Sequence, residues 1–557
     1  MNPPKGTVRF AGRDLAAADV AVRSAALASA LAAEGVRPGD RVVSLLRNST
    51  APVVLVHACR LLDAVLVPLN PRWSAAELAE PAARTAPCAA VVDGVADGDA
   101  DRAAAGVVAG AAGGRVVRLD GWGDVLADRP RRVVEREAAQ GGAAQGVPPV
   151  GDAPSAADFA PADIGASSAP WPPPVEPDRP QAVIFTSGTT GTPKGAVLTW
   201  GNHHANFLGS RARLGHGADD VWLVALPLHH VGGLAIVLRA AWDGSAMIVL
   251  PRFAADDVAR AIGEDGVTIV SLVPSTLRAV LDAWRERFGA RRAPHALRAI
   301  LLGGGPLAAA PVAEAIALGF PLAITYGLTE AASQVATTAP GWTSDASAGA
   351  PPLDGVLVRI DRVDPGAGVR EVARAGDDAA GEILVAGPTI FAGYWEDPAA
   401  TTRAIDGGWL RTGDLGRLDA AGRLRVVGRR DARIVTGGEN VDPAEVEAVL
   451  DGHPGIGASC VVGVPDATWG QIVVAVVEPA RGAEAGGTEA TSPGSAPTDE
   501  APASPDAAAL RVWLDGRLAG YKRPRRVVVV AALPRTAAGK LRRGEVERLA
   551  AGDVDAA

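Results

Sequence analysis

The chain has 557 residues, 48% of them apolar, and 63 acidic against 54 basic residues, which gives a formal net charge of −9. This length exceeds what one compact core needs, so at least two domains are expected. Because a net negative charge repels phosphate, the balance argues against a general nucleic-acid or anionic-membrane binder.

Three widely separated cysteines, Cys59, Cys88 and Cys460, provide neither a disulfide framework nor a zinc-ligand spacing. They fit a reducing compartment, and a cytoplasmic protein is expected. The first residues lack the apolar core of a signal peptide. Charged residues interrupt the two most apolar stretches, 52–69 and 221–250, so no transmembrane helix is predicted.

In chain order, an amphipathic helix over 15–34 is followed by a strand at Arg41–Leu46, a helix over 50–62 and a strand at Ala64–Pro68. This alternation predicts an α/β fold with parallel strands. Further apolar runs, mostly separated by helical stretches, predict strands at Ala182–Phe185, Val221–Leu226, Ala246–Leu250, Thr268–Leu272, Ala299–Leu302 and Leu322–Thr325. The pattern predicts a large domain of doubly wound sheets.

The character of the chain changes in four places. Residues 95–180 are rich in Ala, Gly, Pro and Asp and are predicted to be largely a low-complexity insertion, and 480–507 a flexible surface loop. Short strands with glycine turns over about 355–427 predict a β-rich subdomain. Helices and strands after Gly428 predict a small mobile α+β domain. We therefore expect an N-terminal domain over 1–428 and a C-terminal domain over 429–557.

The strongest local signal directly follows the predicted strand Ala182–Phe185. It reads Thr186, Ser187, Gly188, Thr189, Thr190, Gly191, Thr192, Pro193, Lys194 and Gly195. Backbone N–H and hydroxyl groups in such a turn can converge on phosphate oxygens, and a lysine adds positive charge. The alternative is a plain surface turn. The residues around Lys194 do not fit a Walker A loop, so a P-loop NTPase is not predicted.

This run resembles the phosphate-binding signature of the adenylate-forming superfamily, which includes acyl-CoA synthetases, adenylation domains and luciferases. The resemblance continues in chain order through Tyr326–Glu330, Thr412–Leu415, Gly428–Asp431 and Pro534–Lys540. Each short motif alone is weak evidence, but five in the same order argue against coincidence. The resemblance implies an enzyme that uses ATP, Mg²⁺ and coenzyme A and forms an acyl-adenylate.

By resemblance, Glu330 binds Mg²⁺ and Thr329 contacts phosphate. Asp414 accepts hydrogen bonds from the ribose hydroxyls, and Arg429 helps to hold the ribose and phosphate. Lys540 reaches the substrate carboxylate and the α-phosphate. Four of these residues also have an ordinary alternative: Glu330 as a helix-terminal carboxylate, Asp414 as a turn aspartate, Arg429 as a surface arginine and Lys540 as an exposed lysine.

The resemblance also assigns Gly304, Gly305 and Pro306 to the adenine site, and it assigns Tyr326 and Gly327 of the second signature to nucleotide binding. The run from Gly303 to Ala308 fits the G-x-G-x-x-A fingerprint as well, so nicotinamide binding is an alternative.

Asp431 resembles the family's hinge, about which the small domain rotates between two half-reactions. Lys540 then serves adenylation, and the strand near Gly437 and Gly438 approaches the thiol. A simple turn aspartate is the alternative for Asp431.

The sequence features that indicate coenzyme A binding are weaker. Arg523 and Arg525 resemble residues that contact its nucleotide phosphates, with a solvated basic face as the alternative. Trp469 lies where such ligases often have an aromatic residue near the coenzyme A path, with plain packing as the alternative.

His230 belongs to a motif whose aromatic or histidine position lines the acyl site; a structural histidine is the alternative. Three local sequences resemble those of the branch of the superfamily that activates o-succinylbenzoate for menaquinone biosynthesis. They are Ser271–Ser275, Leu301–Pro306 and Tyr326–Gln334. Alternatives are a coenzyme A ligase for another aromatic or fatty acid, an adenylating enzyme that uses a carrier protein, and a catalytically silent nucleotide-binding protein. The oligomeric state is left open, with a homodimer as one alternative.

Overall fold

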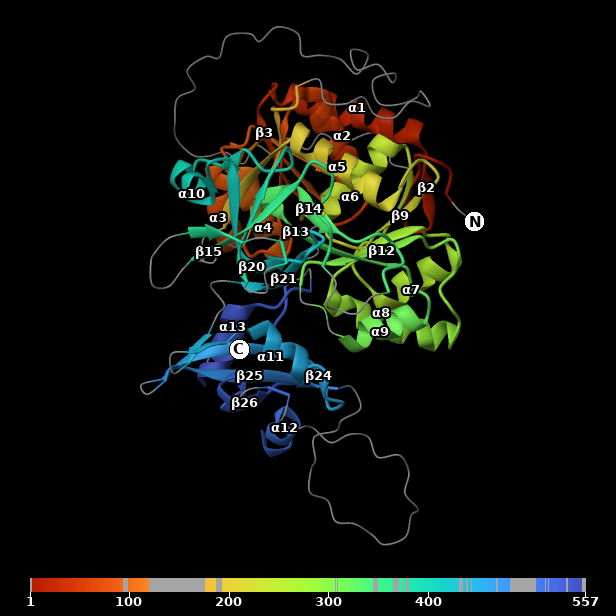
Figure 1. Cartoon of the computed structure of the whole chain (residues 1–557). Helices are drawn as coiled ribbons and strands as arrows, with labels where there is room; N and C mark the ends of the chain where they lie inside the picture. Colours follow the sequence, from red (N-terminus) through yellow and green to blue (C-terminus); the bar gives the residue numbers. More distant parts are fainter. Residues whose placement is uncertain are drawn as a thin grey trace.

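Two large sheets that contain mainly parallel strands dominate the computed structural model (Figure 1). It describes residues 3–93, 99–119, 176–186, 193–305, 307, 309–343, 349–363, 370–373, 375–376, 380–429, 434–436, 439–441, 443–466, 469–480, 507–515, 517–518, 520–536 and 539–552.

The first sheet has the order β18 (Gly393–Tyr394), β8 (Lys194–Thr199), β7 (Pro180–Thr186), β4 (Val65–Pro68), β3 (Arg41–Leu45), β5 (Ala89–Asp93) and β6 (Val116–Leu119). The second has the order β14 (Ser333–Thr337), β13 (Leu322–Leu328), β12 (Ala299–Gly303), β11 (Ile269–Leu272), β9 (Val221–Val224), β10 (Ala246–Val249), β1 (Val8–Phe10) and β2 (Arg13–Leu15). Central strands of both sheets are buried on both faces, which explains their continuous apolar runs.

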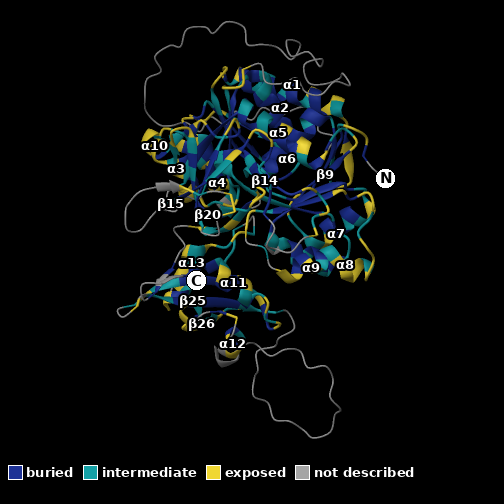
Figure 2. Ribbon diagram, in the orientation of Figure 1, coloured by how far each residue is buried: buried dark blue, intermediate teal, exposed yellow. Residues whose placement is uncertain are grey.

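Helices fill the space between the sheets and cover their outer faces. One core joins both sheets through α1 (Ala17–Ala33), α2 (Thr50–Leu62), α5 (Trp200–Leu214) and α6 (Val231–Asp243). A second core lies under α3 (Ala75–Arg84) and α4 (Asp99–Ala111), and a third under α7 (Ala255–Glu264), α8 (Pro274–Phe288) and α9 (Ala309–Ala317). Figure 2 shows the buried residues concentrated in these layers. The large part is therefore a layered α/β structure.

Two smaller sheets follow. The β-rich sheet has the order β16 (Arg370–Val372), β15 (Leu357–Val363), β17 (Gly381–Ala386), β20 (Trp409–Leu418) and β19 (Ile405–Asp406), with β21 (Leu424–Arg429) also paired to β20; α10 (Pro398–Ala404) lies beside it. The last sheet has the order β23 (Glu439–Val441), β22 (Ile434–Thr436), β25 (Gly470–Pro479) and β24 (Ile456–Asp466), with β26 (Arg526–Val529) on β25. Its two faces pack on α11 (Pro443–Leu450) and α12 (Ala507–Leu514), and on α13 (Arg543–Ala551). The predicted fold class is confirmed.

The strand predicted at Val221–Leu226 ends two residues early, at Val224. The side chain of Asn48 causes this end, because its amide donates to the carbonyl oxygen of Leu226 at 2.9 Å and its oxygen accepts from the N–H of Leu228 at 2.9 Å. A side chain thus takes the hydrogen bonds that would extend the strand, and the freed segment leads to His229 and His230.

The stretch predicted to be an insertion contains ordered structure at its start. Helix α4 and strand β6 lie within it, and Val108 and Leu119 are buried in the cores. Residues 120–175 lie outside the described part. The insertion predicted to make up most of 95–180 stays a prediction, and within it residues 99–119 form a helix that packs against α3 and a strand.

The described helices include none that is both long enough and apolar enough to cross a membrane.

Candidate active site

The predicted phosphate-binding turn joins two paired strands. Thr186 at the end of β7 pairs with Lys194 at the start of β8, and the Thr186 hydroxyl donates to the Lys194 carbonyl oxygen at 3.4 Å. A glycine is needed at position 195 in this strand pair, since a Cβ there would lie 2.7 Å from a Val183 methyl carbon. The connecting residues Ser187, Gly188, Thr189, Thr190 and Gly191 lie outside the described part of the chain.

Tyr394 contacts two of the charged residues that were predicted to belong to the site. Its hydroxyl donates a hydrogen bond of 2.9 Å to Glu330 Oε1. Its ring centroid lies 5.3 Å from Lys194 Nζ, within the range of a cation–π interaction. Glu330 and Lys194 are 136 residues apart in sequence, yet one side chain contacts both.

The short helix that carries Thr329 and Glu330, η3 (Thr329–Ala331), is held by α5. Asn206 of α5 donates to the carbonyl oxygens of Gln334 at 2.8 Å and Ala331 at 3.4 Å. The Glu330 carbonyl oxygen accepts from the N–H of Phe391 at 2.9 Å. These backbone bonds fix where the Glu330 side chain starts.

Buried amides continue this support. Asn202 forms a capping box with Thr199 at the start of α5, and its amide donates to the carbonyl oxygens of Pro388 and Ile390 at 2.9 and 2.8 Å. The segment before Tyr394 is thereby tied to the helix that also supports Glu330.

Tyr326, Asp414 and Arg429 form the next cluster. The Tyr326 hydroxyl donates to Asp414 Oδ2 at 2.6 Å, and Arg429 Nε lies 3.6 Å from Asp414 Oδ1. Burial, followed by the negative charge of Asp414, raises the pKa of Tyr326 well above its usual value, so the hydroxyl stays protonated. The Asp414 carboxylate therefore lies between the Tyr326 hydroxyl and the Arg429 guanidinium.

Glycines allow close backbone approach around this cluster. A Cβ on Gly327 would lie 1.6 Å from the carbonyl oxygen of Ser333, at a bulge between β13 and β14. Gly304 has φ +84°, and Gly305 continues the same turn after β12. Pro306 lies outside the described residues. Gly327 is therefore required for close backbone approach and Gly304 for its positive φ, whereas a Cβ on Gly305 would make only ordinary contacts, the nearest at 3.8 Å.

Lys540 reaches the large domain from the small one. Its backbone N–H donates to the Thr536 hydroxyl at 3.2 Å, its carbonyl oxygen accepts from the Thr536 N–H at 2.7 Å, and Gly539 has φ +80°. Its Cε lies 3.6 Å from the point where a Cβ on Gly304 would stand. We call the turn formed by Arg535, Thr536 and Gly539–Leu541 the Lys540 turn.

Lys540 is exposed to solvent, but protein groups surround its ammonium and displace part of its hydration. Desolvation lowers its pKa, the charge of Glu330 opposes this effect, and Arg429 adds to it. Lys540 therefore shares one electrostatic environment with Glu330, Asp414 and Arg429.

His230 lies at the N-cap of α6, and its ring centroid is 4.3 Å from that of His229. Burial, with a contribution from the Lys540 charge, lowers the pKa of His230 to about 4. The imidazole is thus neutral near pH 7 and can donate or accept a hydrogen bond.

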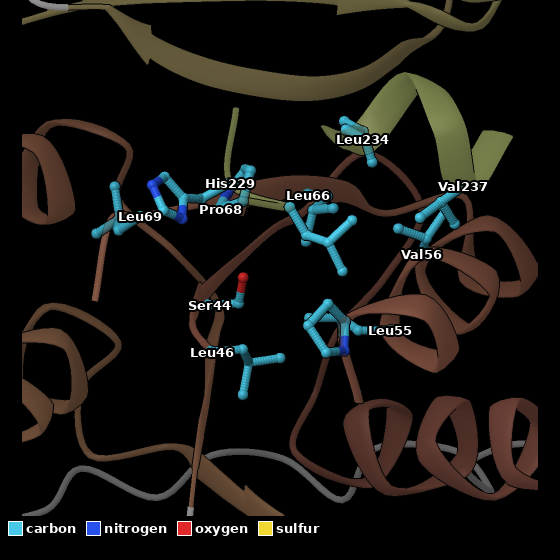
Figure 3. A pocket seen from close by; sticks show the side chains of 12 residues that line it. Ser44, Leu46, Leu55, Val56, Leu66, Pro68, Leu69, His229, Leu234 and Val237 are labelled. Carbon is cyan, nitrogen blue, oxygen red and sulfur yellow. The ribbon is translucent and has the colours of Figure 1, made fainter. Parts of the chain in front are cut away.

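Behind His229 lies a cavity of about 20 Å³ between the first sheet, α2 and α6 (Figure 3). Its lining is mainly aliphatic and is made by Ser44, Leu46, Pro52, Leu55, Val56, Leu66, Pro68, Leu69, Leu228, His229, Leu234 and Val237. In Figure 3, Leu234 and Val237 lie at the end opposite His229 and Leu69. This space suits about one water molecule and is too small for an aromatic acid.

The predicted coenzyme A residues lie in the small domain. The Arg525 guanidinium stacks on Trp469, 3.9 Å from the ring centroid, and Trp469 is 40% exposed. Arg523 instead pairs with Asp515 at 2.8 Å and donates to the Leu518 carbonyl oxygen at 2.9 Å. The structure thus joins Arg525 and Trp469 in one accessible cluster and directs Arg523 toward its own domain.

Asp431, Gly437 and Gly438 lie outside the described residues. Their roles as hinge and thiol-side strand stay predictions.

Tyr394 was not among the predicted site residues. The composition held a signal, since the chain has only three tyrosines and two of them bond to predicted site carboxylates.

Among the described residues, no three His, Cys, Asp or Glu side chains group as a metal site. One carboxylate, Glu330, beside a hydroxyl at Thr329 nevertheless fits Mg²⁺. This ion keeps several waters and is held by one or two carboxylates together with substrate phosphates.

These features agree with the comparisons to known proteins. Residues 2–395 match the family described as AMP-binding enzyme, and residues 445–540 match its C-terminal domain. The chain belongs to the AMP-binding enzyme family.

Within the family, the chain is 36% identical over 552 residues to the 2-succinylbenzoate–CoA ligase of Geobacillus kaustophilus, covering 99% of this chain and 96% of the relative. The Bacillus cereus enzyme of that name is 38% identical over 375 residues, covering 67% of this chain and 70% of the relative. The o-succinylbenzoate CoA synthetase of Bacillus subtilis in complex with its acyl-adenylate intermediate superposes with a TM-score of 0.75 and 30% identity, covering 98% and 95% of the two chains. ATP-bound MatB from Rhodopseudomonas palustris gives a TM-score of 0.76 and 28% identity, covering 99% and 97%.

Proposed function

We infer that the protein is an AMP-forming ligase that joins o-succinylbenzoate to coenzyme A. The similarity to 2-succinylbenzoate–CoA ligases over almost the full length of both chains carries this conclusion. The clustering of Lys540, Glu330, Asp414 and Arg429 supports it, because these are the charges that adenylation needs.

In the first half-reaction, a substrate carboxylate oxygen attacks the α-phosphorus of ATP. The new C–O–P linkage forms as the bond to pyrophosphate breaks, which converts the carboxylate into an acyl group with AMP as leaving group. Attack brings two anions together, at a cost of about 4 kcal/mol at ~4 Å with an effective dielectric of ~20. Positive groups must offset this cost.

The chain supplies such groups from two domains. We assign Lys194 and the preceding turn to the phosphates, and Lys540 to the α-phosphate and the carboxylate. Glu330 and Thr329 would hold Mg²⁺, which supplies further positive charge at the phosphate oxygens when bound. Asp414 and Arg429 would orient the ribose, so that the α-phosphorus faces the acid.

In the second half-reaction, the thiol of coenzyme A gives up its proton to solvent and its sulfur attacks the acyl carbon. AMP leaves with the bonding electron pair, and a thioester forms. The Arg525–Trp469 cluster presents a cation and an aromatic face that suit a nucleotide phosphate and a base. We assign to the neutral His230, whose pKa is influenced by the charge of Lys540, a hydrogen bond with the acyl group. The free cysteines agree with the predicted cytoplasmic location.

Pyrophosphate release tests this proposal, with ATP, Mg²⁺ and coenzyme A present and o-succinylbenzoate, benzoates and fatty acids compared as substrates. A coenzyme A-dependent signal that is strongest with o-succinylbenzoate is expected. A stronger signal with another acid would retain the ligase chemistry and overturn the assigned substrate. Pyrophosphate release that stops after one turnover and does not increase when coenzyme A is added would favour transfer to a carrier protein.

A further inference from the structure

We propose that Tyr394 is a positioning residue that holds Glu330 and Lys194 apart, so that both charges face the triphosphate instead of each other. The inference deepens the proposed function and rests on it for the roles of Glu330 and Lys194.

Sheet register places the ring of Tyr394 beside Lys194. Strand β18 pairs antiparallel with β8, and Tyr394 lies opposite Ala196. Lys194 precedes Ala196 by two residues, so its side chain emerges on the same face as a diagonal neighbour of Tyr394. This geometry accounts for the 5.3 Å separation between Lys194 Nζ and the ring centroid.

The hydroxyl of Tyr394 extends past the lysine to Glu330 Oε1, at 2.9 Å. Because a phenol is ordinarily protonated at neutral pH, the Tyr394 hydroxyl is the donor in this bond. This bond fixes Oε1 of Glu330, and the planar carboxylate group then also sets the direction of Oε2.

The backbone around Tyr394 is anchored on two sides. Its N–H donates to the Thr401 hydroxyl at 2.8 Å, and the next N–H, of Trp395, donates to the Gly195 carbonyl oxygen at 2.7 Å. Gly393 has φ +139°, and a Cβ there would lie 2.8 Å from the Thr401 methyl carbon. The tyrosine therefore projects from a backbone with little freedom to shift.

The arrangement separates two charges that would otherwise attract. In the described part of the chain, Lys194 and Glu330 each contact Tyr394, the cation at the ring face and the carboxylate at the hydroxyl. A direct ion pair would neutralise both groups and weaken their attraction for phosphate and metal. An aromatic phenol suits the intermediate position because its face attracts cations and its edge donates to anions.

Two substitutions separate the hydroxyl from the ring. Tyr394→Phe removes the bond to Glu330 and keeps the cation–π contact, whereas Tyr394→Leu removes both. Tyr326→Phe is the matched contrast, because it removes a phenol bond to Asp414 instead. Circular dichroism and thermal melting verify that each variant is folded, and Tyr394→Phe alone is decisive if Tyr394→Leu does not fold.

The measurement is calorimetric binding of ATP at a series of Mg²⁺ concentrations, without any acid. Tyr394→Phe is expected to raise the Mg²⁺ concentration that half-saturates ATP binding by about tenfold, with unchanged ATP affinity at saturating Mg²⁺. Tyr394→Leu should weaken ATP binding even at saturating Mg²⁺. Tyr326→Phe should weaken ATP binding without shifting the Mg²⁺ midpoint.

An unchanged Mg²⁺ midpoint in folded Tyr394→Phe, or an equal shift in Tyr326→Phe, would overturn the inference. The assay is independent of the acid, so a shifted midpoint in an enzyme that does not activate o-succinylbenzoate would support the inference while overturning the proposed substrate.

Discussion

Replacing Lys540 by alanine should separate the two half-reactions. The variant loses the ammonium that lies next to Gly304 and interacts with Glu330 and Asp414, but it retains the backbone of the Lys540 turn. One positive charge about 4 Å from an anion at an effective dielectric of ~20 contributes about 4 kcal/mol, which corresponds to roughly a thousandfold in rate. We predict a loss of this size in adenylation.

Two assays measure the half-reactions separately. Acid-dependent exchange of labelled pyrophosphate into ATP reports adenylation, and thioester formation from supplied acyl-adenylate and coenzyme A reports the second step. Lys540→Ala should lose the first and largely retain the second. Arg542→Ala is the matched control, since it removes a cation two residues away that is exposed and paired with Glu545 at 2.7 Å; both rates should stay near those of the parent enzyme.

Equal loss of both half-reactions in folded Lys540→Ala would refute the reasoning, because it would show that the lysine serves a step common to both. Loss of adenylation in Arg542→Ala to the same extent would show that the general positive potential of the turn matters, and not the ammonium of Lys540.

Three further predictions follow from the same geometry. Asp414→Asn should raise the KM for ATP by about tenfold with little change in melting temperature, measured by initial rates and thermal unfolding; an unchanged KM would contradict the ribose assignment. Because the pKa of Lys540 is lowered, adenylation should decline with rising pH earlier than an ordinary lysine allows, and Lys540→Arg should move that decline upward if it retains activity; identical pH profiles would count against Lys540. Burial lowers the pKa of His203 to about 3, so the contribution of the neutral imidazole to the free energy of unfolding is complete above pH ~6.5 and falls by about 2 kcal/mol at pH 5. Urea unfolding above pH ~6.5 and at pH 5 should therefore show a smaller difference in the free energy of unfolding for His203→Gln than for the parent protein. An equal difference would refute this account.

Local patterns predicted much of the fold because central strands of a layered α/β structure are buried on both faces. The run predicted as the strand Thr268–Leu272 is observed as Ile269–Leu272, and the helix predicted over 50–62 is observed as Thr50–Leu62. Sequence motifs also indicated residues that the fold does bring together, such as Tyr326 and Asp414.

Features that depend on distant partners could not be read locally. The end of β9 is set by Asn48, 178 residues away from Leu226, and the role of Tyr394 depends on a strand pairing between β18 and β8. The border predicted at 428 stays a prediction, because the two family matches end at 395 and resume at 445.

The pairing of β1 has a consequence for how the chain is made. Val8 in β1 lies beside Met247 in β10, and β1 turns back into β2 through Ala11 and Gly12, both with positive φ. During synthesis from the ribosome, the first strand must therefore wait until about 240 further residues have emerged before its parallel partner exists. The early chain meanwhile carries α1 and α2 without the second sheet that later covers them. We expect vectorial folding to stall at this stage, with nascent-chain apolar surface exposed to chaperones until β10 has left the exit tunnel.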